Sequence, residues 1–154
     1  MAHILEGQVT INGKDIWKEY GVFLTEEKNG GRDNINAILA PSKVKDHVGV
    51  DIRELNGKKY SENLTVTNQE REVTLRFALY AKTKSEWMSR YQAFIGMLKS
   101  GDNGWLNVQF PTLGITLKMF YVSGSQFRSL TYLWNEGVQA GKFNITFKEP
   151  SPTI

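Results

Sequence analysis

The chain has 154 residues, of which 40% are apolar and 23% are charged, and its formal net charge is +3 at neutral pH. These values are typical of one globular domain that can bury a core without disulfides or structural metals, so we expect a single domain over residues 1–154. The absence of cysteine excludes a disulfide framework, a thiol nucleophile and a sulfur-ligated metal. Basic residues do not cluster beyond the pair Lys58-Lys59, which argues against sequence-specific nucleic-acid binding.

The first residues, MAHILEGQ, have neither the basic nor the apolar part of a secretory signal. No apolar run approaches the roughly 20 residues that a membrane span needs. We therefore expect synthesis in a cytoplasm without a cleavable signal, and no membrane partner.

The first element in chain order is a β-hairpin. Apolar residues lead into Asn12-Gly13, and Asn-Gly between apolar runs favours a type I′ turn, which needs positive φ at both central positions. Tyr20, Val22 and Leu24 then alternate with other residues, which predicts that the second strand continues to about Leu24.

The stretch Thr25–Val48 has charges, the pair Gly30-Gly31 and Pro41, but no sustained period. A loop of about 20 residues is uncommon in a compact domain and is usually functional or disordered. Two interpretations stay open for its apolar residues: a short helical turn folded back on the core, or an arm that lies on a neighbouring subunit. Under the second, the residues predicted to contact the neighbour are Arg32, Ile35, Ile38 and Leu39.

Strands dominate the next part of the chain. Val50–Arg53 is followed by a second turn at Asn56-Gly57 and by weak alternation over Lys58–Thr67. Alternation is then clear from Val73 to Tyr80, which predicts a half-buried strand.

A single amphipathic helix is predicted after this strand, over about 84–100. Thr83 with Glu86 has the form of a capping box, and Gly101 follows the last turn as a stop signal. One stripe of apolar residues predicts packing across a sheet; its members are Trp87, Tyr91, Phe94, Ile95 and Leu98.

Four further strands are expected after the helix, followed by a polar tail over residues 150–154. The strands cover about 105–110, 115–122, 126–132 and 143–148. The fold class is therefore mainly β: a β-sandwich or open barrel of 8–9 mostly antiparallel strands with one α-helix packed on it.

No catalytic, metal-binding or cofactor-binding site is predicted. The two histidines, His3 and His47, have no partners with ligand or triad spacing, and no phosphate-loop or nucleophile-elbow motif occurs. Aromatic residues on outward strand faces favour a protein–protein interface instead. These residues are Tyr80, Trp105, Phe120 and Trp134, and Trp105 and Phe120 join the predicted subunit interface.

The order of these pieces resembles the N-terminal domain of the distal tail proteins of long-tailed bacteriophages, over roughly residues 8–152. The motifs that carry the resemblance are I-N-G-K-D-I, V-G-V-D-I, E-V-T-L-R-F-A-L-Y before the helix, G-W-L-N-V-Q-F-P after it, F-Y-V-S-G-S, and the closing G-K-F-N-I-T-F-K-E-P-S-P.

The resemblance implies a tail-tube-like fold that assembles as a homo-oligomeric ring, a hexamer in the family. Because the apolar burial of the loop is set against the entropy of ordering about twenty residues, we expect a ring that is weak alone and monomeric in dilute solution. It implies partners in the tail-tube and baseplate hub proteins, a location in the virion tail, and synthesis in the bacterial host cytoplasm. The loop 25–48 would serve packing between subunits. Many members carry a second, galectin-like domain, and this chain stops at Ile154, so the ring-forming and adaptor roles are expected rather than direct binding of host carbohydrate.

Other interpretations remain. The chain could be another component with the tail-tube fold, such as a tube protein, a tail-completion protein or an injection-system ring. It could be a small β-sandwich module whose outward aromatics bind a carbohydrate or a peptide. An enzyme is the least favoured class.

Overall fold

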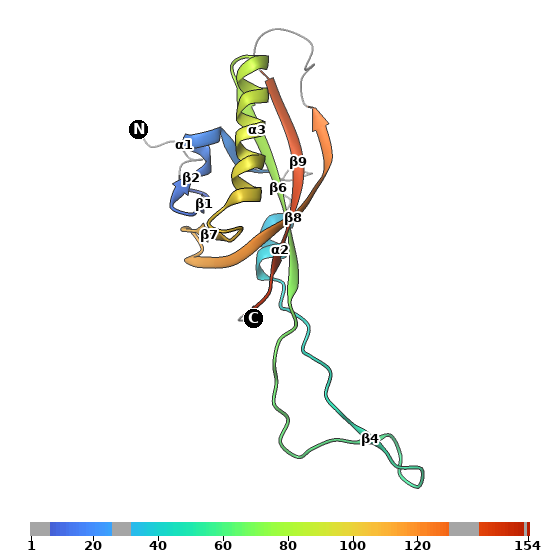
Figure 1. The fold of residues 1–154 in the computed structure, drawn as a ribbon. Coiled ribbons are helices and arrows are strands. Elements are labelled where there is room, and N and C mark those ends of the chain that lie inside the picture. The colour runs from blue at the N-terminus through green and yellow to red at the C-terminus, as the bar shows by residue number, and fades with distance from the viewer. Residues whose placement is uncertain (1–6, 26–31, 130–138, 153) are drawn as a thin grey trace.

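The computed structural model describes residues 7–25, 32–129, 139–152 and 154 (Figure 1). Within these ranges there are nine strands and three helices. The strands are β1 (Thr10–Ile11), β2 (Lys14–Asp15), β3 (Val22–Leu24), β4 (Val50–Asp51), β5 (Lys58–Lys59), β6 (Arg71–Ala81), β7 (Leu106–Phe110), β8 (Ile115–Ser129) and β9 (Gln139–Glu149). The helices are α1 (Ile16–Tyr20), α2 (Asp33–Leu39) and α3 (Lys84–Ser100).

Seven of these strands form one curled antiparallel sheet in the order β2-β1-β7-β8-β9-β6-β3, while β4 and β5 pair only with each other. The centre of the sheet is the pairing of β6 with β9, which runs without a break from Arg71↔Glu149 to Ala81↔Gln139. The predicted fold class is confirmed, in the form of an open half-barrel.

The predicted helix is confirmed as α3, which lies along the sheet next to β6 and β9 (Figure 1). The Thr83 hydroxyl caps its start by accepting the Glu86 N–H at 3.1 Å. Trp87, Phe94 and Leu98 are buried, and the Trp87 indole N–H donates to the Leu79 carbonyl at 2.9 Å. This bond satisfies the one polar atom of a large core side chain.

Phe94 is the central side chain of the helix–sheet contact. Its ring centroid lies 5.6 Å from that of Phe77 on β6 and 6.1 Å from that of Phe143 on β9. Tyr91 and Ile95, on the edge of the same stripe, are only partly buried against this cluster. The stripe is therefore core packing and not a groove.

The first hairpin is confirmed, but its second strand ends at Asp15 and does not continue to Leu24, and Val22–Leu24 forms the separate strand β3. Asn12 and Gly13 have φ values of 52° and 82°, as a type I′ turn requires. Residues 16–20 form α1 instead of a strand, because Asp15 caps the Trp17 N–H at 3.1 Å and Gly21 ends the helix in the left-handed region.

The break expected near residue 123 is also absent. β8 continues through Ile115–Ser129, and the irregularity takes the form of register shifts against β9, between Tyr121 and Ser123 and between Ser125 and Arg128. The strand expected over 126–132 is thus the second half of β8 as far as Ser129, and residues 130–132 lie outside the described ranges.

We predict that Phe94→Ala lowers the free energy of unfolding by about 3–5 kcal/mol, because a fully buried aromatic ring is replaced by a cavity. Urea unfolding followed by circular dichroism measures this. The matched control is Met88→Ala on the exposed face of α3, for which we expect a change within about 0.5 kcal/mol. A loss below about 1 kcal/mol for Phe94→Ala would contradict the helix–sheet packing.

Candidate functional site: an arm and its root

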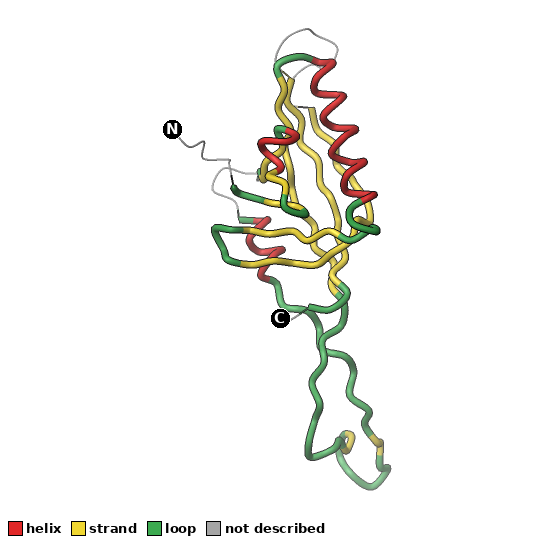
Figure 2. Tube along the Cα trace, turned by 60° about the vertical axis from the view of Figure 1, so that its left-hand side comes forward, coloured by secondary structure: helices red, strands yellow, loops and turns green. Residues whose placement is uncertain are grey.

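Residues 43–69 leave the body of the fold as two extended stretches, here called the arm (Figures 1 and 2). Near its far end β4 pairs with β5 through Val50↔Lys59 and Asp51↔Lys58. The turn between them contains Gly57 at φ 68°, at the predicted second turn. The arm lies later in the chain than the stretch 25–48 that the sequence predicted for it.

The arm exposes an unusual number of apolar side chains. Val48 is 91% exposed and Val66 is 63% exposed, on opposite stretches of the arm. The other exposed apolar residues are Val50, Leu55, Tyr60 and Leu64. Six exposed apolar side chains gathered on one extension favour an interaction site.

The two stretches of the arm enclose an open hollow of about 580 Å³, lined in part by His47, Lys58 and Val66. The Tyr60 ring crosses to the other stretch and lies against Gly49, where a Cβ would come within 2.8 Å of the ring carbons. Glycine at this position therefore permits a contact between the stretches that a larger residue would obstruct.

At its root the arm is a short antiparallel ladder. The Lys45 N–H donates to the Thr67 carbonyl at 2.8 Å, and the Gln69 N–H donates to the Lys43 carbonyl at 2.7 Å. A bridge joins Val44 to Asn68 between these two bonds. The two stretches thus leave the body as one unit.

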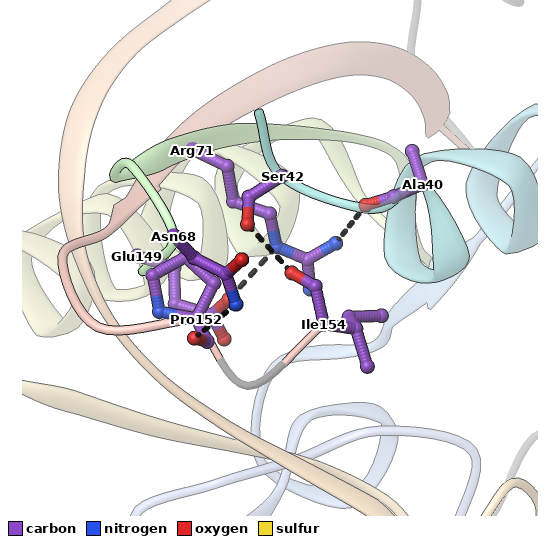
Figure 3. A network of polar contacts seen from close by, with 7 residues as sticks. All are labelled: Ala40, Ser42, Asn68, Arg71, Glu149, Pro152 and Ile154. Carbon is purple, nitrogen blue, oxygen red and sulfur yellow. Dashed lines mark hydrogen bonds and ion pairs between the residues drawn. The ribbon is translucent and has the colours of Figure 1, made fainter. Parts of the chain in front are cut away.

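Residues 152 and 154, after the end of β9, contact both sides of the root of the arm (Figure 3). The Ile154 main-chain oxygen accepts from the Ser42 N–H at 3.0 Å and from the Ser42 hydroxyl at 2.6 Å. The Asn68 side-chain amide donates to the Pro152 carbonyl at 3.2 Å. Ser42 directly precedes the outgoing stretch and Asn68 lies near the end of the returning one, so these contacts bridge the two.

A buried ion pair lies directly behind this contact (Figure 3). Arg71 Nε lies 2.8 Å from Glu149 Oε1, and each side chain is only 7% exposed. Arg71 Nη1 donates to the Ala40 carbonyl, which follows α2. The third guanidinium nitrogen, Nη2, is buried without a hydrogen-bond partner among the described residues. The pair ties α2, the arm and the end of β9 to one point.

The predicted interface residues of the stretch 25–48 divide between core and surface. Ile38 is 1% exposed and packs in the core of its own subunit, so it is withdrawn from the predicted interface. Arg32, Ile35 and Leu39 are exposed. Of the two interpretations of this stretch, the helical turn folded back on the core is therefore the one that residues 33–39 adopt.

Asn34, which the sequence did not single out, anchors α2. Its side-chain oxygen accepts the Arg76 N–H at 2.7 Å, and its amide donates to the carbonyls of Arg76 and Thr25 at 3.2 and 2.8 Å. Beside it, an apolar hollow of about 180 Å³ opens between α2 and the turn after β7. Its apolar lining is Leu24, Ile35, Ile38, Phe110 and Leu113.

Trp105 and Phe120 lie together on the body, with ring centroids 5.7 Å apart in an edge-to-face arrangement. The Lys118 ammonium lies 4.8 Å from the centroid of the Trp105 ring. Hollows of about 460 and 290 Å³ open on either side of Trp105. Tyr80 is half-buried, and Trp134 lies outside the described residues.

No group of three or more His, Asp or Glu side chains within the described ranges could hold a metal ion. His47 belongs to the arm, and His3 is outside those ranges. Burial raises the pKa of Tyr20 and of Tyr91 above the ordinary tyrosine value. None of the helices described here has the length and hydropathy to cross a membrane.

Comparison with solved structures finds one similar fold that bears on these features: the Dit protein of phage SPP1, described as a paradigm of the hub adsorption apparatus in phages that infect Gram-positive bacteria. The TM-score is 0.59 at 11% sequence identity, and the match covers 92% of this chain and 49% of Dit. The chain thus spans about half the length of Dit, and the likeness is one of fold. Neither the protein-family models nor the curated proteins give a match.

We predict that Arg71→Met costs about 3–5 kcal/mol of unfolding free energy, because it leaves Glu149 buried without its partner. The double variant Arg71→Met/Glu149→Leu should recover most of this loss, because apolar side chains can replace a buried ion pair. Urea unfolding of both variants measures the difference.

The control for this pair is Lys148→Ala, which breaks a more exposed ion pair with Glu70 at 3.5 Å and should cost less than about 1 kcal/mol. A double variant no more stable than Arg71→Met alone would show that the buried charges do more than neutralise each other.

Proposed function

We propose that this chain is a structural protein of a bacteriophage tail that forms a homo-oligomeric ring and acts as a distal tail or baseplate adaptor between the tail tube and the tip. The observation that carries the proposal is the arm, because it extends away from its own body and exposes apolar side chains there. The fold shared with Dit supports the assignment to a phage tail.

The arm is suited to a contact between subunits. From the root to the turn it has about 13 residues, which at about 3.3 Å each can reach roughly 40 Å from the body. Burying each of its apolar side chains on a neighbour would contribute about 1.5–3 kcal/mol. An extension of this length with several exposed apolar side chains fits a chain that binds another subunit better than a chain that acts alone.

A free sheet edge supports the same proposal. β7 pairs with β8 only over Ile115–Met119, and beyond Met119 no described strand pairs on that side of β8. The second half of β8 also carries the exposed residues Val122 and Phe127. A long edge with apolar side chains tends to pair with another chain, and a ring of identical subunits covers every such edge.

The ring has six subunits in the family that the sequence resembles, and six is the number we propose. Its partners would be tail-tube and baseplate hub proteins, its place the virion tail, and its role non-enzymatic. Arg32, Ile35, Leu39, Trp105 and Phe120 are proposed as body residues of the interface. A tube protein, a tail-completion protein or an injection-system ring would assemble through the same kind of contact between subunits.

A second candidate function is a small carbohydrate- or peptide-binding module. The observation in its favour is the pair of hollows beside Trp105, since aromatic rings flanked by polar groups are common in binding sites. Such a module would stay monomeric at high protein concentration, whereas a ring component would not.

We predict that shortening the arm abolishes assembly without unfolding the body. Residues 46–66 are replaced by Asn-Gly, which closes a two-residue hairpin between Lys45 and Thr67, two residues already paired at the root. Light scattering over a range of concentrations, and complementation of a phage that lacks the protein, measure assembly. A deletion that included α2 would remove Asn34 and Ile38 from the fold and would not separate the two effects.

The expected result is a folded monomer at all concentrations and no infectious tails, while the parent assembles as its concentration rises. The matched control is Lys82→Ser, an exposed change on the body away from the arm. A shortened variant that assembles and complements as well as the parent would contradict the role of the arm.

A further inference from the structure

We propose that the residues described after β9, 150–152 and 154, act as a latch that fixes the direction of the arm relative to the sheet. The segment continues directly from β9, which is paired with β6 over its whole length, so the latch starts from the longest unbroken strand pairing among the described residues. It contacts Ser42, directly before the outgoing stretch of the arm, and Asn68, near the end of the returning stretch. Two separate attachments restrict rotation of the arm about its root more than one would.

The root has a fixed layer and an exposed layer. The fixed layer is the buried ion pair between Arg71 and Glu149, which holds the point from which the arm leaves. The exposed layer is the contact of Ser42 with the main-chain oxygen of Ile154: the Ser42 hydroxyl bond is solvent-exposed, and Ile154 is 46% exposed, whereas the Asn68–Pro152 bond is part-buried. Water can replace exposed hydrogen bonds at little net cost. The exposed layer can therefore open while the fixed layer stays closed.

The composition of the latch fits this role. Pro150 and Pro152 have fixed φ angles and no N–H group, so the segment cannot extend the sheet by donating at these positions. The Pro152 ring is buried, which seats the segment on the body, while its carbonyl faces the Asn68 amide of the arm. The segment is thus preordered to offer acceptors to the arm.

The consequence is a conformational device. With the latch closed, the arm points in one direction before any partner is present. With the latch displaced, the arm keeps the bonds of its own root ladder but loses its fixed angle. A partner that takes hold of residues 150–154 would therefore change the geometry of assembly, and this consequence for assembly rests on the proposed function of the arm.

The absence of cysteine allows a direct test, because spin labels can be placed at introduced cysteines alone. Labels at Lys58→Cys on the arm and Ala93→Cys on α3 report the arm–body distance by pulsed electron spin resonance. Labels at Ala93→Cys and Thr116→Cys report a distance within the body. All of these positions are exposed. Dilute protein is used, so the result does not depend on ring formation.

Three variants are compared with the parent: residues 150–154 replaced by Gly-Ser-Gly-Ser-Gly, the double variant Ser42→Ala/Asn68→Ala, and the matched control Ser151→Ala on the exposed side of the same segment. We expect a narrow arm–body distribution in the parent and in the control. The segment replacement should at least double its width, and the double variant should broaden it to a smaller extent because the Ser42 N–H is retained. The body distance should not change.

An arm–body distribution that is already broad in the parent, or that stays narrow after the segment is replaced, would overturn the latch. Broadening of the body distance in the replaced variant would also overturn it, because the segment would then support the whole fold. If replacing the segment broadens the arm–body distribution as expected but shortening the arm leaves assembly intact, the proposed function is wrong and the latch proposal stands.

Discussion

The unbroken pairing of β6 with β9 is the constraint on which the rest of the structure depends. At one end of this ladder, Ala81 pairs with Gln139 and the chain turns into α3, whose buried face closes the core. At the other end, Arg71 pairs with Glu149 and the chain meets the arm. Since both ends belong to the same two strands, the core and the arm share one rigid frame. The fold can therefore carry the long arm at one end without losing the packing of its hydrophobic core at the other.

The parts that the sequence predicted well have local signals. The stripe of α3 and its Thr83 cap lie within one continuous segment, and so does the Asn12-Gly13 turn. The sequence signals conflict at α1, because the alternation of Tyr20, Val22 and Leu24 is typical of a strand, whereas the cap at Asp15 and the stop at Gly21 are typical of a short helix. Short helices have few residues in which to show a period, so their caps are the better signal.

The root of the arm could not be predicted, because its contacts join residues far apart in the chain. Arg71 and Glu149 look like ordinary charged residues at the ends of strands, and only the register of β6 against β9 brings them together. The same holds for Ser42 and Ile154. The sequence predicts the arm at 25–48, earlier in the chain than the structure places it. The glycines and charges of 25–48 are typical of a loop, whereas residues 43–69 contain weak strand signals. The two stretches differ in how exposed their side chains are in the fold, and the sequence alone does not show this exposure.

The structure also changes the energetics expected of the proposed assembly. Ordering about 20 free residues on a neighbour would cost roughly 1–2 kcal/mol of backbone entropy for each residue, which in total exceeds what burial of the arm's apolar side chains would contribute. In this fold the root ladder, the β4–β5 pair and the latch already order part of the arm in the single chain. That share of the cost belongs to folding and not to association. A preordered arm leaves more of its apolar burial available as binding energy.

An arm on one side of a subunit favours a head-to-tail contact, because it must reach a different surface on the next copy. Candidates for that surface are the apolar hollow beside α2 and the aromatic pair of Trp105 and Phe120, both on the body. Head-to-tail contacts close into a ring only when each subunit adds the same rotation, and otherwise they continue as an open helix. A freely swinging arm would not define that rotation. The direction set by the fixed frame of β6 and β9, with the latch at its end, is the property that a closing ring requires.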